Sequence, residues 1–176
     1  MMNTFYYKTI FYTACFTLLS CSSGPEDQQK ASDEASLKSL EKANRYLIKT
    51  ENEDIENYIR RHGWTMQKTG SGLQYMIFEN GTGEHAGKGK TAVLNYKTWL
   101  LNGNLIYSSE QSGQKIFKIG KGGVESGLEE AILLMRVGDK ANLIIPSHLA
   151  YGLLGDDNKV PPRSALVYEI ELVTLK

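Results

Sequence analysis

The residues best suited to chemistry lie near the C-terminus of the chain. Ala150-Tyr151-Gly152 is followed by a polar loop, by Val160-Pro161-Pro162 and by an alternating segment at 165–172. Strict alternation is typical of a half-buried strand, and the two prolines restrict the backbone of the loop before it. A loop tyrosine, an aliphatic residue beside prolines and an aromatic residue on a strand favour a concave apolar pocket. The same pattern is also that of a core strand after a surface loop.

An antiparallel sheet must position these residues. Alternating segments separated by turn residues predict strands near 72–78, 91–101, 105–109, 116–119, 140–145 and 165–172. Asn102-Gly103 predicts a hairpin, and helical spacing over 128–135 predicts a short helix. We therefore expect an α+β fold, in which a sheet of about five strands wraps one short helix.

A helical arm is predicted before this domain, over residues 32–63. Thr50-Glu51-Asn52-Glu53 matches a capping box, which favours a helix over 51–62 preceded by another helix. One long helix with a joint near Thr50 is the alternative. The narrow apolar stripe predicts packing against the domain or against a second copy, as in a homodimer, and a solvated arm is equally compatible with it.

The N-terminus has the pattern of a secretory signal over residues 1–20. Leu18-Leu19-Ser20-Cys21 resembles the bacterial lipobox, which implies a diacylated Cys21 that anchors the chain to a membrane. An ordinary signal peptide is the alternative. Residues 21–31 are polar and predict a flexible tether. By the same resemblance, we expect the outer membrane, with the domain facing the periplasm.

Several function classes are disfavoured by composition. The chain has 20 basic and 20 acidic residues and no basic stripe, so we expect no nucleic-acid partner. His62, His85 and His148 are far apart, and we expect no metal. The glycines at 120–123 lack the Lys-Ser/Thr of a phosphate-binding loop, and Gly-x-Ser-x-Gly is missing. We therefore expect no cofactor and no covalent catalysis.

Prolyl cis/trans isomerisation needs none of these groups. It breaks no covalent bond, and its barrier is the amide resonance, about 18–20 kcal/mol. The twisted transition state has a smaller amide dipole than the planar ground state. A dry apolar pocket with one or two donors for the substrate carbonyl therefore lowers the barrier.

The order of motifs from about Thr91 to Lys176, half of the chain, resembles the FKBP-type peptidyl-prolyl cis-trans isomerases. The matching motifs are Val93-Leu94-Asn95-Tyr96, Ser108-Ser109, Phe117-Lys118-Ile119-Gly120, Val124, Gly127-Leu128-Glu129-Glu130-Ala131, Met135-Arg136-Val137-Gly138, Ala150-Tyr151-Gly152, Val160-Pro161-Pro162 and the strand at 166–172. The resemblance implies an isomerase domain over 72–176. The lipobox and the arm resemble FKBP-like lipoproteins linked to gliding motility in Gram-negative bacteria.

The resemblance also implies site residues. The walls of the pocket would be Tyr96, Phe117, Val124, Leu128, Val160 and Tyr168. The Tyr151 hydroxyl and the Glu125 backbone N–H would hold the substrate carbonyl, and the proline ring would rest on Leu128.

The chain departs from the family pattern at several of these positions. Ile106-Tyr107 replaces Phe-Asp, Lys115 replaces a Phe, Glu125 replaces an Ile and Leu128 replaces a Trp. Two hypotheses follow. One is an active isomerase that helps proline-containing polypeptides to fold outside the cytoplasm. The other is a binding module that grips such segments in a membrane-associated complex and catalyses little.

Overall fold

The computed structural model describes residues 25–176. The predicted signal peptide and Cys21 lie outside these residues. The chain divides into two compact units, Met1–Ala43 and Asn44–Lys176. The described part of the first unit is helical, and the second contains the sheet and the candidate site.

The helix α1 runs without interruption from Pro25 to His62. Our prediction of a flexible tether is therefore wrong for residues 25–31, where proline at the first helical position and two acidic residues after it favour a helix start. A joint near Thr50 is also absent from α1. The Thr50 hydroxyl donates to the Tyr46 carbonyl, 3.1 Å away, so it bonds within the helix and does not cap a new one.

The end of α1 falls where the sequence predicts it. The N–H of Gly63, with φ 65°, donates to Arg60, and the N–H of Trp64 donates to Ile59. A glycine with positive φ just after the last turn is a common helix terminator. Among residues 25–176, α1 and every other helix are too short or too polar to cross a membrane.

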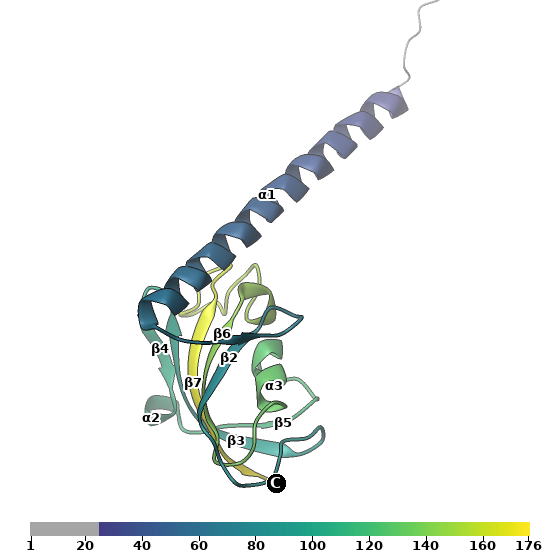
Figure 1. Ribbon diagram of the computed structural model, residues 1–176. Coiled ribbons are helices and arrows are strands. Elements are labelled where there is room, and N and C mark those ends of the chain that lie inside the picture. Colours follow the sequence, from purple (N-terminus) through teal and green to yellow (C-terminus); the bar gives the residue numbers. More distant parts are fainter. Residues whose placement is uncertain (1–24) are drawn as a thin grey trace, which may run out of the picture. The chain divides into compact units, whose positions relative to one another are not determined.

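Seven strands form one antiparallel sheet within the described residues (Figure 1). They are β1 (Gln67–Lys68), β2 (Gln74–Glu79), β3 (Thr91–Leu100), β4 (Leu105–Ser108), β5 (Lys115–Lys118), β6 (Lys140–Ile145) and β7 (Leu166–Leu175). The order is β1-β2-β6-β7-β3-β4, and β5 also pairs with β3. The α+β class and the antiparallel sheet are confirmed, and the number of strands is higher than the predicted five.

Two short elements lie in segments that we expected to be irregular. β1 lies between the predicted arm and the first predicted strand, and it pairs with β2. The short helix α2 (Ser109–Ser112) occupies the start of the predicted loop after β4. The predicted hairpin is confirmed, because the N–H of Leu100 donates to Asn104 and Gly103 has φ 89°.

The helix α3 (Ser126–Ile132) lies against one face of the sheet (Figure 1). Gly127 permits this close approach, since a Cβ atom there would lie 2.4 Å from Cγ2 of Ile145 on β6. The main core fills the space between α3 and the sheet. Because side chains alternate along a strand, Leu166 and Tyr168 of β7 face this core.

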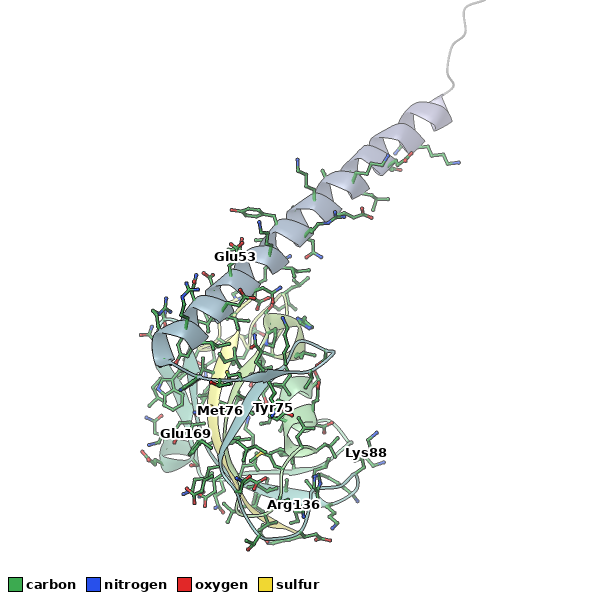
Figure 2. The ribbon with its side chains drawn as sticks, viewed as in Figure 1. Glu53, Tyr75, Met76, Lys88, Arg136 and Glu169 are labelled. Atoms are coloured by element: carbon green, nitrogen blue, oxygen red, sulfur yellow. The ribbon has the colours of Figure 1, made fainter. Side chains whose placement is uncertain are left out.

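The opposite face of β7 is also buried. Ile55 and Tyr58 of α1 form a second core with Ile144, Ala165 and Val167. The last turns of α1 therefore pack against the sheet, which decides between the packing alternatives for this part of the arm. In β2, which lies between β1 and β6, the alternate residues Tyr75 (labelled in Figure 2) and Ile77 pack against the main core.

Candidate active site

The eight predicted site residues come together on the α3 side of the sheet. Five of them are buried in the main core, namely Tyr96 of β3, Phe117 of β5, Leu128 of α3, Val160 and Tyr168 of β7. Val124 and Tyr151 pack against this core. The eighth, Glu125, directly precedes α3. The sheet register explains the grouping, because Thr98 of β3 is opposite Tyr168, which places the Tyr96 and Tyr168 ring centroids 6.5 Å apart.

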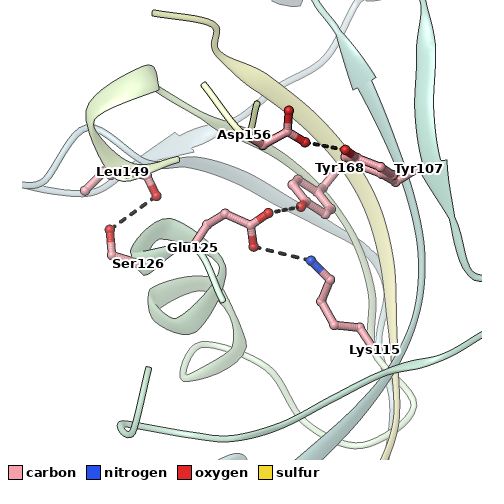
Figure 3. Close-up of polar contacts among 7 residues, drawn as sticks. All are labelled: Tyr107, Lys115, Glu125, Ser126, Leu149, Asp156 and Tyr168. Carbon is pink, nitrogen blue, oxygen red and sulfur yellow. Dashed lines mark hydrogen bonds and ion pairs between the residues drawn. The ribbon is translucent and has the colours of Figure 1, made fainter. Parts of the chain in front are cut away.

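A buried carboxylate lies among these aromatic residues. Oε1 of Glu125 accepts a 2.6 Å hydrogen bond from the Tyr168 hydroxyl, and Oε2 lies 3.4 Å from Nζ of Lys115 (Figure 3). Tyr151 also interacts with this carboxylate, whose charge contributes to the raised pKa of the Tyr151 hydroxyl. We call Tyr96, Lys115, Glu125, Tyr151 and Tyr168 the Glu125 cluster.

The cluster keeps Glu125 ionised. Burial raises the pKa of this carboxyl. The Lys115 ammonium, the hydrogen bond from Tyr168 and the polar groups of the Glu125 backbone N–H and of Tyr151 outweigh burial, so the pKa is lower than the ordinary 4.5. Burial and the Glu125 charge raise the pKa of both Tyr168 and Tyr151 above 10.0. At neutral pH the cluster therefore holds one anion, one cation and neutral tyrosines.

This arrangement differs from the one that the resemblance implies. The Tyr151 hydroxyl and the Glu125 N–H, expected to hold a substrate carbonyl, both interact with the Glu125 carboxylate and lower its pKa. Leu128, on which a proline ring was expected to pack, is 0% exposed. A substrate can therefore reach these groups only if side chains of the cluster move.

A second carboxylate shapes the neighbouring loop. Asp156 accepts hydrogen bonds from the backbone N–H groups of Asn158, Lys159 and Val160, at 3.0, 2.9 and 2.7 Å. It also accepts one from the Tyr107 hydroxyl of β4 (Figure 3). These bonds fix the turn that places Val160 against the core.

Sequence reasoning missed two of these roles. It assigned only a backbone role to Glu125 and no role to Asp156. An aspartate two to four residues before the N–H groups it binds is a signal for such a turn. No comparable local signal marks Glu125, because its partners are distant in the sequence. In the described part of the chain, no three His, Cys, Asp or Glu side chains gather closely enough to hold a metal ion.

A sheet covered by one short helix, with aromatic side chains between the two layers, defines the class of this domain as a small α+β fold. Residues 82–173 match the family model for FKBP-type peptidyl-prolyl cis-trans isomerase. The chain belongs to this family, and the resemblance noted in its sequence is confirmed at that level.

Three comparisons illustrate the relationship. FK506-binding protein 1 of Dictyostelium discoideum is 34% identical over 60% of this chain and 99% of its own length. Outer membrane protein MIP of Legionella longbeachae is 34% identical over 60% of this chain but only 45% of its own length. The crystal structure of FkpA from Escherichia coli matches with a TM-score of 0.65 and 30% identity, over 89% of this chain and 74% of that one.

Proposed function

We propose that this protein catalyses cis/trans isomerisation of X-Pro bonds in polypeptides, with the Glu125 cluster and its apolar neighbours as the site. The observation that carries the proposal is the convergence of Tyr96, Leu128, Val160 and Tyr168 from four separate segments. The chain also belongs to an isomerase family, and the two observations together favour an enzyme.

The reaction follows from the surroundings of the bound amide. Apolar walls from Tyr96, Leu128 and Val160 disfavour the polar planar amide more than the twisted one. The Tyr151 hydroxyl and the Glu125 N–H would hold the substrate carbonyl. The bound amide then twists without cleavage of a covalent bond. The barrier that the site lowers is about 18–20 kcal/mol for the uncatalysed rotation.

The experiment is NMR exchange on a panel of X-Pro peptides with the full chain. We expect exchange well above the uncatalysed rate, which takes tens to hundreds of seconds. Tyr168→Leu should lower kcat/KM at least tenfold, while Tyr46→Leu, at an exposed position of α1, should leave it unchanged. Wild-type activity in folded Tyr168→Leu would refute the site assignment.

The polar character of the cluster favours a second candidate, the binding module. Lys115 and Glu125 stand where the family pattern has apolar residues, and the two form an ion pair in the site. Under this alternative, the same peptides shift the NMR resonances of cluster residues but exchange at the uncatalysed rate.

We extend the proposal to an anchor at Cys21. Its support is the Leu18-Leu19-Ser20-Cys21 motif and the relative named as an outer membrane protein. The anchored protein would assist envelope proteins at the outer membrane, facing the periplasm. Wild-type chain should incorporate labelled palmitate and fractionate with outer membranes, and Cys21→Ser should do neither. From the resemblance to gliding-motility lipoproteins we also propose a role in gliding motility. Deletion of the gene tests this role and should abolish colony spreading.

We also propose that α1 mediates a homodimer. Its support is the row of exposed apolar side chains along the helix, which are Leu37, Leu40, Leu47 and Ile48. Deletion of residues 22–43 leaves Ile55 and Tyr58, which belong to the second core, and should halve the mass measured by light scattering. An unchanged mass would refute the dimer.

A further inference from the structure

Lys115 brings a cation to the aromatic walls of the site. Its Nζ lies 5.1 Å from the ring centroid of Tyr96 and 5.7 Å from that of Tyr168, over both ring faces. The side chain is 22% exposed, whereas that of Glu125 is 2% exposed. The ammonium therefore lies between the buried carboxylate and the solvent, where an entering peptide meets it.

The hydrogen-bond capacity of the Glu125 cluster is unevenly used. The Tyr168 hydroxyl has one hydrogen to donate, and it bonds Glu125. The Lys115 ammonium has three N–H donors, and Oε2 of Glu125, 3.4 Å away, accepts one of them. Lys115 therefore has donors to spare for a substrate.

The twisted amide offers an acceptor that the planar amide lacks. In the planar form the lone pair of the prolyl nitrogen is delocalised into the carbonyl. In the twisted form it is localised on nitrogen and can accept a hydrogen bond. A donor placed at that nitrogen stabilises the transition state and not the ground state, which is the condition for raising kcat.

We propose that Lys115 is a catalytic residue of this site, and that its ammonium donates a hydrogen bond to the prolyl nitrogen in the twisted transition state. Glu125 is the positioning residue, because its carboxylate holds Nζ beside the rings of Tyr96 and Tyr168. A fixed, partly dehydrated cation makes a stronger hydrogen bond than a neutral donor. The inference rests on the proposed isomerase function.

The test separates kcat from KM by NMR exchange in the full chain. Lys115→Met should lower kcat at least tenfold and change KM less than threefold, since an interaction made only in the transition state affects kcat and kcat/KM equally. Lys115→Arg, which keeps a cationic donor, should retain kcat within about threefold. The matched control is Lys118→Met, at the exposed end of the same strand β5, which should leave both constants unchanged.

A second variant deals with loss of folding. Lys115→Met leaves the buried Glu125 without its cation, which can unfold the domain. Lys115→Met/Glu125→Gln removes both charges and keeps the side-chain shapes, and it should show the same loss of kcat. NMR spectra of each variant report its fold.

The outcomes distinguish the two proposals. An inactive wild-type chain that is folded refutes the proposed function, and this inference with it. An active wild-type chain refutes the inference alone if folded Lys115→Met or the double variant keeps its kcat. The inference alone is also refuted if Lys115→Arg lowers kcat as much as Lys115→Met does, or if Lys115→Met changes KM and leaves kcat unchanged.

Discussion

The Tyr168 hydroxyl donates a 2.6 Å hydrogen bond to Oε1 of Glu125, and this bond joins the first half of β7 to the residue that precedes α3. Both side chains are buried. A buried carboxylate that loses a donor retains the cost of its desolvation. The bond therefore holds the helix and the sheet together while keeping a charge inside the site.

A double-mutant cycle on this pair should show strong coupling. Tyr168→Phe should lower the free energy of unfolding by about 1–3 kcal/mol, because Glu125 loses a donor. The Tyr168→Phe change should cost much less in a Glu125→Ile background, with a coupling of at least about 1 kcal/mol. Urea denaturation measures each variant, with Tyr46→Phe on exposed α1 as the control. Additive effects would show that the bond contributes no net stability.

Stability should depend on pH through Glu125. Because its folded-state pKa is lower than the ordinary 4.5, its contribution is fully present above pH 4.5 and is lost as the pH falls through the folded-state pKa. Glu125→Gln should therefore reduce the decline in the free energy of unfolding below pH 4.5, measured by urea denaturation. Glu53→Gln, at an exposed position, should show the same decline in the free energy of unfolding as wild type. Parallel curves for wild type and Glu125→Gln would contradict this assignment.

Removal of the Asp156 carboxylate should loosen the turn before Val160. Asp156→Ala leaves three backbone N–H groups and the Tyr107 hydroxyl without their acceptor. We expect a loss of about 1–3 kcal/mol in unfolding free energy. We also expect kcat/KM for X-Pro peptides to fall roughly tenfold, because Val160 is no longer held in place.

The control for Asp156 is its neighbour. Asp157→Gly removes an exposed carboxylate at φ 57°, a backbone conformation that glycine adopts without strain. This variant should stay within about 0.5 kcal/mol of wild type. Equal effects at both positions would mean that the hydrogen bonds of Asp156 do not order the turn.

The contact between α3 and β6 should tolerate no added methyl group. In Gly127→Ala the new Cβ would lie 2.4 Å from Cγ2 of Ile145, so α3 must shift. We expect a loss of about 1–3 kcal/mol and lower isomerase activity, because α3 carries Leu128. Gly87→Ala has no heavy atom within 4 Å of the new Cβ and should be neutral in thermal unfolding. A stable, fully active Gly127→Ala would contradict the packing of α3 described above.

Local patterns in the sequence determined much of the fold. The predicted strand at 140–145 has the bounds of β6, and Asn102-Gly103 forms the predicted hairpin. The end of α1 before Gly63 also follows from turn residues. Spacing indicated a helix over 128–135 as well, but α3 begins two residues earlier and ends three residues earlier than this predicted range. These features depend on interactions between residues close in the sequence, so a period or a glycine is sufficient to indicate them.

Family resemblance selected the residues of the site, but it did not give the contacts of their side chains. Eight positions taken from motifs lie together in the structure, because a fold constrains where its motifs meet. It does not constrain what a substituted side chain will bind. Lys115 and Glu125 were identified as departures from the pattern, and only the structure pairs them.

Tertiary structure alone decided the rest. Glu125 meets Tyr168 across 43 residues of sequence, and Tyr107 meets Asp156 across 49. The second face of β7 is buried because Ile55 of α1, more than a hundred positions earlier, packs onto it. In each case the folding of the whole sheet brings the partner close. The type of a charged or apolar residue in the sequence indicates neither its partner nor which face of the sheet is buried.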